Sequence, residues 1–202
     1  MRLGGNSCLR SLFGVLGALS LSACASFLSP AAEPLLAQRD GLQDFALEAR
    51  FSLRHEEKSY TGHLSWRHAG SRDNLLLASP FGQGMAEIAG DASGVRLTTS
   101  DGKTYTAADA ETLTHQALGF PLPLKNLVDW VRGRSSGGEP EALDAFGRPL
   151  RVRQDGWRID YEYDSDDPQA LPGRLFIERA GLLELRLRID EWHALHDESA
   201  TP

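Results

Sequence analysis

Cysteine is almost absent from this chain: its 202 residues include only Cys8 and Cys24, both near the N-terminus. Two cysteines so close to one end cannot build a disulfide scaffold, so the folded part must be held together by its own core. Positive charge is not in excess either, because 21 Lys and Arg stand against 28 Asp and Glu, a net charge of −7. Without a basic block, nucleic acid is not an expected partner.

Long apolar runs are missing as well. The uncharged, mostly apolar stretch at 11–21 is too short to cross a bilayer as a helix, which takes about 20 residues. Before it, the only charged residues are Arg2 and Arg10, and after it come Leu21-Ser22-Ala23-Cys24. A positive start, a short apolar run and small residues predict a secretory signal over 1–23 that is removed by cleavage.

The end of this signal resembles the bacterial lipobox. The resemblance implies that Cys24 becomes the first residue, with a diacylglycerol on its sulfur and a palmitoyl chain on its amino group. Several acyl chains together make a lasting membrane anchor. An Asp directly after the cysteine would resemble an inner-membrane retention signal, but this chain has Ala25 there. The expected location is therefore the periplasmic face of the outer membrane. The alternative is an ordinary export signal that Cys24 merely follows.

Sequence motifs for catalysis are not found. There is no Gly-x-Ser-x-Gly elbow and no phosphate-binding loop, and His193 and His196 lack a third metal ligand at useful spacing. We therefore expect no catalytic residues, no metal and no cofactor. A lipid hydrolase whose Ser and His meet only in the fold stays open as an alternative that no motif favours.

Alternation of apolar and polar residues is the main structural signal and begins at Phe45. It indicates strands with one buried and one solvated face. Strands are expected at 45–54, 60–66, 74–78, 85–89, 95–99, 103–105, 157–163 and 183–189. This defines a domain over 45–192, which follows a tether over 24–44 with a short helix from Pro34 to Asp44. A polar tail is expected over 193–202.

Two helices interrupt the strands. Thr106-x-x-Asp109 resembles a capping box and predicts a helix that ends near Gly119. A second helix should end at Gly133. Its apolar face holds Leu124, Leu127, Val128 and Val131. The residues 135–149 are expected to form a loop.

Together these elements predict one antiparallel sheet with helices on its apolar face. Two short helices cover such a face incompletely, which leaves room for an apolar cavity. The inward residues that could line it are Phe51, Leu64, Trp66, Trp130, Trp157, Tyr161, Leu185 and Leu187. The alternative is that these side chains form an ordinary packed core.

One turn carries an aromatic residue at its tip. In the segment Ser79–Gly84, Pro80 and Gly82 flank Phe81 between two apolar strands. Either the ring folds back onto the sheet or it points into solvent, and the sequence leaves both possibilities open.

Several of these segments, in this order, resemble the LolB family of outer-membrane lipoproteins. They are the lipobox at Cys24, strand 45–54, segment 75–82, segment 119–124 with Trp130, and the ending 185–192. The resemblance implies a mainly β fold with α: an open, half-closed antiparallel β-barrel whose helices form a lid over an apolar cavity.

The resemblance also implies a function without catalysis. The protein would accept lipoproteins from the periplasmic carrier LolA, hold their acyl chains in the cavity and release them into outer-membrane lipids, acting as a monomer. Pro80, Phe81 and Gly82 would form the membrane-insertion loop, with Phe81 in the place of the usual leucine. The alternative is a structural outer-membrane lipoprotein that scaffolds an assembly and binds no lipid. A continuous apolar cavity would distinguish the two.

Overall fold

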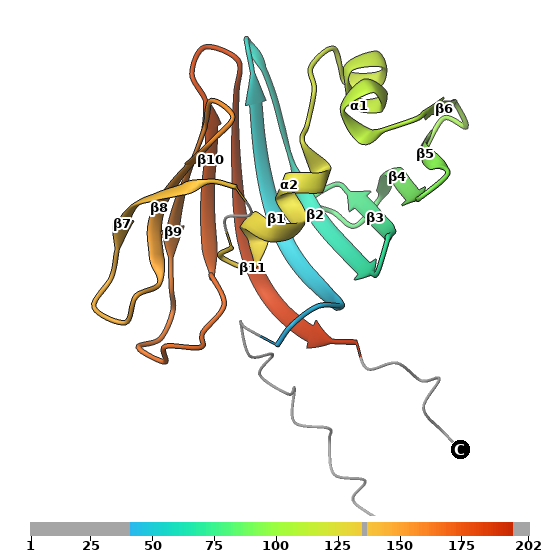
Figure 1. Cartoon of the computed structure of the whole chain (residues 1–202). Helices are drawn as coiled ribbons and strands as arrows, with labels where there is room; N and C mark the ends of the chain where they lie inside the picture. Colours follow the sequence, from blue (N-terminus) through green and yellow to red (C-terminus); the bar gives the residue numbers. More distant parts are fainter. Residues whose placement is uncertain (1–40, 135–136, 196–202) are drawn as a thin grey trace, which may run out of the picture. The chain divides into compact units, whose positions relative to one another are not determined.

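The computed structural model describes residues 41–134 and 137–195, and this part folds into one antiparallel sheet of eleven strands with two helices (Figure 1). The strand order is β6-β5-β4-β3-β2-β1-β11-β10-β9-β8-β7, so the last strand pairs with the first. The strands are β1 (Phe45–His55), β2 (Lys58–Ala69), β3 (Arg72–Ala78), β4 (Gly84–Asp91), β5 (Gly94–Thr99), β6 (Thr104–Ala107), β7 (Glu139–Leu143), β8 (Pro149–Gln154), β9 (Trp157–Glu162), β10 (Arg174–Arg179) and β11 (Leu183–Ala194). The helices are α1 (Ala110–Leu118) and α2 (Leu124–Val131).

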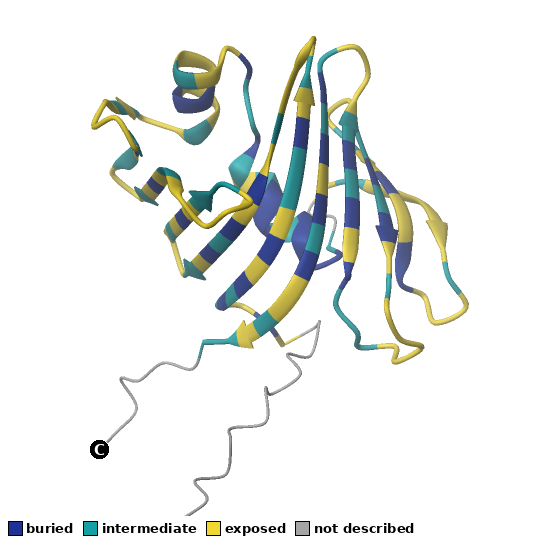
Figure 2. Ribbon diagram, turned by 180° about the vertical axis from the view of Figure 1, so that it is seen from behind, coloured by how far each residue is buried: buried dark blue, intermediate teal, exposed yellow. Residues whose placement is uncertain are grey.

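The sheet is curved but not closed. Its edges are β6 and β7, which α1 and α2 separate in the sequence. Along β1, buried Leu47, Ala49 and Leu53 alternate with exposed or half-buried residues, and Figure 2 shows the same bands on neighbouring strands. This period of two buries one face of the sheet. The predicted open antiparallel barrel is confirmed.

The helices lie on the buried face. The N-cap of α1 is Asp109, whose side chain accepts a hydrogen bond from Thr112 N at 2.7 Å, and the C-cap is Gly119 at φ 89°. The capping box predicted that Thr106 caps this helix. Thr106 instead lies in β6, where it pairs with Arg96 of β5. The helix consequently starts at Ala110, and its end at Gly119 is confirmed.

Several boundaries differ from the sequence predictions, which also gave no strand at β8 or β10. The expected loop over 135–149 contains β7 and the first residue of β8; the pattern misses β7 because all its residues are exposed. β11 runs to Ala194, two residues into the expected tail. Of the expected helix from Pro34 to Asp44, residues 34–40 lie outside the described residues, and 41–44 form a turn and bend. No helix in the described ranges is long and apolar enough to cross a membrane.

Buried Arg132 ties the end of α2 to the segment that enters β1. Its guanidinium donates to the carbonyls of Val128 at 2.9 Å and Leu42 at 2.9 Å, and it pairs with Asp129 at 2.6 Å. Burial lowers the pKa of the guanidinium, whereas Asp129 acts in the opposite direction. Each of the three guanidinium nitrogens thus donates to an oxygen, which is what a buried charge requires.

Arg132→Ala should therefore lower the free energy of unfolding by about 3 kcal/mol, because it leaves the Asp129 carboxylate and the Leu42 carbonyl without their donor. Urea unfolding followed by circular dichroism measures this. Arg134→Ala, two residues away and half-buried, is the control and should cost less. Equal losses in the two variants would contradict the role assigned to Arg132.

Candidate functional site

The concave face of the sheet is apolar across its width. Trp66 is 2% exposed on β2, and Trp157 and Tyr161 are 4% and 3% exposed on β9. Seven of the eight residues expected on the inward faces are buried: Leu64, Trp66, Trp130, Trp157, Tyr161, Leu185 and Leu187. Phe51 is half-buried and packs against this cluster.

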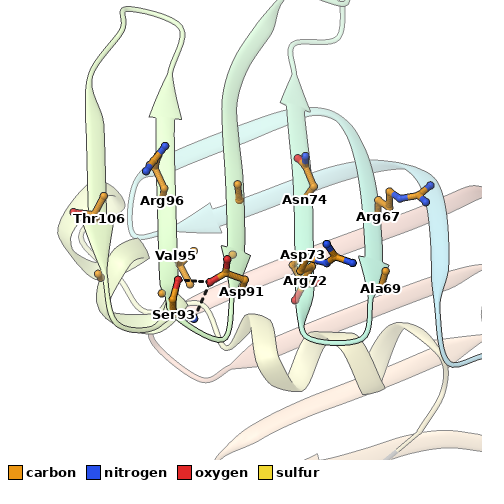
Figure 3. Close-up of a pocket in the computed structure, with 14 residues that line it drawn as sticks. Arg67, Ala69, Arg72, Asp73, Asn74, Asp91, Ser93, Val95, Arg96 and Thr106 are labelled. Atoms are coloured by element: carbon orange, nitrogen blue, oxygen red, sulfur yellow. Dashed lines mark hydrogen bonds between the residues drawn. The ribbon is translucent and has the colours of Figure 1, made fainter. Parts of the chain in front are cut away.

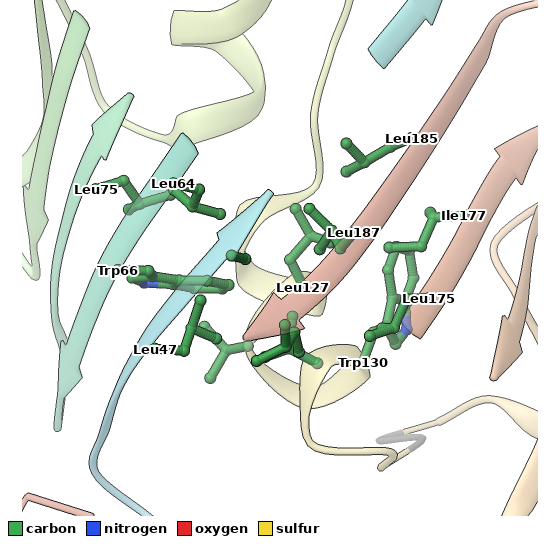
Figure 4. Packing of buried hydrophobic residues seen from close by; sticks show 14 of the residues in the cluster. Leu47, Leu64, Trp66, Leu75, Leu127, Trp130, Leu175, Ile177, Leu185 and Leu187 are labelled. Atoms are coloured by element: carbon green, nitrogen blue, oxygen red, sulfur yellow. The ribbon is translucent and has the colours of Figure 1, made fainter. Parts of the chain in front are cut away.

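Helix α2 lies within the concavity rather than above an empty space. Leu127 sits among side chains of β1 and β11, and Trp130 lies towards β10 (Figure 4). The ring of Trp130 is 5.9 Å from that of Trp157, and its Nε1 donates to Gln154 Oε1 at 2.8 Å. The helix thereby supplies the apolar partner that the sheet needs.

The hollows described within 41–134 and 137–195 lie outside this apolar interior. One of them, about 770 Å³, is lined by residues of β2 to β6 that include three arginines. A second, about 470 Å³, touches Phe51 and Leu187 but is otherwise lined mainly by arginines of the outer face. An open cavity lined by the predicted residues is therefore not among them, and those residues instead contact one another and α2.

Phe51 marks the place where the apolar interior reaches the β3–β4 loop. Gly62 pairs with Phe51, and a Cβ on Gly62 would stand 3.1 Å from the Phe51 ring and 2.0 Å from the carbonyl oxygen of Ala78. A bulge between Leu77 and Ala78 accompanies this contact. Glycine is thus required at 62, because any side chain would displace the residue from which the loop departs.

The β3–β4 loop, residues 79–83, is closed by its own hydrogen bonds. Ser79 N donates to the carbonyl of Gln83 at 2.7 Å, and Gly82 N donates to the carbonyl of Ser79 at 2.9 Å. The hydroxyl of Ser79 also accepts from the backbone N–H groups of Phe81 and Gln83, at 3.3 and 3.2 Å. Gly82 has φ 82°, which other residues seldom adopt. These bonds close the loop into a compact turn.

Phe81 projects from this loop into solvent. Its exposed fraction is 94%, whereas the other exposed large apolar residues of the described chain reach at most 55%. No residue in 79–83 is charged, and Pro80 and Gly82 are exposed beside the ring. The structure thus settles the question that the sequence left open: the ring points outward. An uncharged apolar tip can enter an apolar phase without desolvating a charge.

The site predicted from sequence thus has two parts, the concave face and the loop, which meet at Phe51. Cys24, the expected lipid attachment site, lies outside the described residues. Sequence reasoning missed Gly62, whose signal was a glycine inside an alternating strand.

Comparison with known proteins gives consistent matches. The family model described as "Outer membrane lipoprotein LolB" matches residues 43–192. Among curated proteins, "Outer-membrane lipoprotein LolB" of Dechloromonas aromatica is 41% identical, covering 91% of this chain and 98% of its own. The protein of the same name in Thiobacillus denitrificans is 39% identical, covering 88% and 94%. A solved LolA superfamily protein from Nitrosomonas europaea aligns with TM-score 0.47 and 9% identity over 77% of this chain and 88% of that one.

The family model covers more than half of the chain, and the curated relatives align over nearly their whole length. The match over 43–192 includes the resembling segments from strand β1 to the end of β11. The chain belongs to the outer-membrane lipoprotein LolB family.

Proposed function

We propose that this outer-membrane lipoprotein accepts lipoproteins from the periplasmic carrier LolA, holds their acyl chains against the concave face, and releases them into the outer membrane. The observation that carries the proposal is the 94% exposed Phe81 on a hydrogen-bonded loop, joined at its root to an apolar interior. A scaffold without lipid contact has no need of such a ring in water.

Acyl chains would enter by exchanging contacts with α2. The helix is short, and three of its residues, Leu124, Asn126 and Asp129, are only half-buried. An acyl chain that replaces Leu127 and Val128 against the sheet restores apolar contact at about 0.8 kcal/mol per buried methylene. The concave face thus stays covered whether α2 or cargo occupies it.

The direction of transfer would follow from differences in affinity. A difference of about 1.4 kcal/mol in binding free energy favours one site over the other about tenfold, and burying about two more methylenes supplies that difference. Half-buried Phe51 and Leu77 line the way from the interior to the β3–β4 loop, so a chain that leaves there remains in apolar contact. Phe81 then places the exit at the membrane.

Cys24 would fix the location and take no part in cargo binding. With diacylglycerol on its sulfur and palmitate on its amino group, it would anchor a monomer at the periplasmic face of the outer membrane. The tether proposed over 24–44 would link that anchor to the domain.

A transfer assay tests the proposal. Purified LolA carrying a labelled triacylated lipoprotein is mixed with this chain, the two are separated, and the label on each is counted. The label should move to this chain. Phe51→Glu should reduce acceptance about tenfold, because it places a carboxylate at the entrance to the apolar interior. Leu76→Glu is the matched control, since Leu76 is 48% exposed on the outer face.

Acceptance that stays at zero for the parent chain, with LolA still loaded and native circular dichroism, would favour the scaffold. If Phe51→Glu and Leu76→Glu accept cargo equally well, Phe51 does not lie on the route that the acyl chains take.

A further inference from the structure

The polar hollow of about 770 Å³ lies on the outer face of β2 to β6 (Figure 3). Its base is a row of direct cross-strand partners, each exposed: Arg67, Asn74, Ala89, Arg96 and Thr106. Ala89 stands in the middle of the row, and because its side chain is small, the surface there is lower than at the neighbouring residues. Arg67 and Arg96 stand towards its two sides, with Asn74 between them (Figure 3).

The arginines around this hollow differ from most others in the chain. Those of the 470 Å³ hollow are held by carboxylates, in the pairs Arg50–Asp190, Arg174–Glu162, Arg186–Glu184 and Arg188–Asp164. Within the described residues, the guanidinium groups of Arg67, Arg72 and Arg96 form no side-chain hydrogen bond or ion pair, although the charge of Arg72 acts on nearby Asp91. Three guanidinium groups therefore keep their donors available on a protein whose net charge is negative.

The two carboxylates in the lining, Asp73 and Asp91, offset part of this charge and leave a net charge of +1 against the three arginines. Asp73 faces the interior, where its Oδ1 accepts from Trp66 Nε1 at 2.8 Å and lies 2.8 Å from His68 Nδ1. Asp91 accepts from the N–H and hydroxyl of Ser93 at 2.7 and 2.5 Å. These bonds lower the pKa of Asp91, and the charge of Arg72 adds to the effect.

We propose that this hollow binds phosphate groups, carried either by a soluble phosphorylated compound or by a lipid headgroup. Guanidinium forks match phosphate oxygens, and the side chains of Asn74, Ser93 and Thr106 add neutral donors from the same lining. β2 and β5 are about 14 Å apart across the sheet. The spread of the arginines and the volume fit a ligand with more than one phosphate.

The hollow is separate from the proposed lipid path. β3 begins at Arg72 beside the hollow and ends at Ala78, where the Phe81 loop departs. At the hollow end, Gly70 N donates to Asp44 Oδ1 at 2.8 Å, so this end adjoins the start of the domain. Phosphate binding and membrane insertion would then occur at opposite ends of β3.

Calorimetry with inositol hexakisphosphate at low salt tests the site, using the full mature chain with Cys24→Ala. The parent should bind, and Arg67→Gln with Arg96→Gln should weaken binding at least tenfold, since each removes charge-assisted hydrogen bonds. Arg174→Gln with Arg186→Gln removes the same charge from the other hollow and should leave the affinity unchanged. Equal weakening by both pairs, or citrate binding as tightly as the phosphate probe, would overturn the phosphate site.

Vesicles distinguish the two sources of phosphate. Co-sedimentation is measured with phosphatidylcholine vesicles, with and without phosphatidylglycerol. An increase caused by phosphatidylglycerol that Arg67→Gln with Arg96→Gln abolishes assigns the site to a lipid headgroup. Calorimetric binding without that increase assigns it to a soluble compound. If neither probe binds in an arginine-dependent manner, the proposal is wrong.

Discussion

Phe81→Glu should lower the rate at which cargo enters liposomes about thirtyfold and leave acceptance from LolA unchanged. Burying a phenylalanine ring in the acyl region contributes about 2 kcal/mol, which corresponds to roughly thirtyfold, and a carboxylate at that depth costs free energy instead. The ring is 94% exposed, so its replacement removes no core contact and the protein should fold normally. Acceptance and insertion are scored separately with purified LolA, this chain and liposomes.

Two variants control this experiment. Phe81→Leu should insert cargo like the parent, because it keeps an apolar side chain on the same loop. Phe146→Glu makes the identical change at another exposed phenylalanine, 44% exposed on the turn between β7 and β8, and should also behave like the parent. If Phe81→Glu inserts cargo at the parental rate, the loop is only a hairpin turn and has no role in insertion. Unfolding of that variant would mean that the ring has a packing role.

Cys24→Ala should move nearly all of the protein from the membrane fraction to the soluble fraction. Three acyl chains form a lasting anchor, whereas an alanine side chain offers no attachment point for them. The described domain begins well after this position and has no disulfide to lose, so folding and cargo acceptance should persist. The variant is exported with an ordinary cleavable signal, and fractionation and the LolA transfer assay are carried out on the same preparation.

The control is the parent chain with its own signal, which should fractionate with the outer membrane. If the soluble variant is folded but accepts no cargo, the acyl groups on Cys24 take part in binding and the division of roles is incorrect. If it stays in the membrane fraction, another part of the chain supplies the anchor.

The sheet could be predicted from sequence wherever burial alternates. β1 and β11 each bury every second residue over long stretches, so their period of two is plain. β7 could not be found in this way, because it is an edge strand with every residue exposed and it contains Pro140. The start of α1 was misplaced because Thr106 and Asp109 both suit a cap, and pairing with β5 decides between them.

The candidate site was predictable in composition but not in arrangement. The inward aromatic residues follow from alternation, yet the position of α2 against them depends on contacts distant in sequence, such as Arg132 with the Leu42 carbonyl. The exposure of Phe81 was undecidable for a similar reason. It depends on Ser79 closing the loop and on Gly62 leaving space for Ala78, which are tertiary features.

Quenching of tryptophan fluorescence by brominated acyl chains tests the central claim, that cargo chains lie against the concave face. A variant that keeps only Trp157, with phenylalanine at 66, 130 and 192, is loaded by LolA with a lipoprotein carrying brominated chains. The account predicts strong quenching of Trp157 relative to the same lipoprotein with unbrominated chains, because this ring is buried on the concave face of β9, which stays in place when cargo replaces α2. Cargo that binds to the folded protein without quenching Trp157 would contradict it.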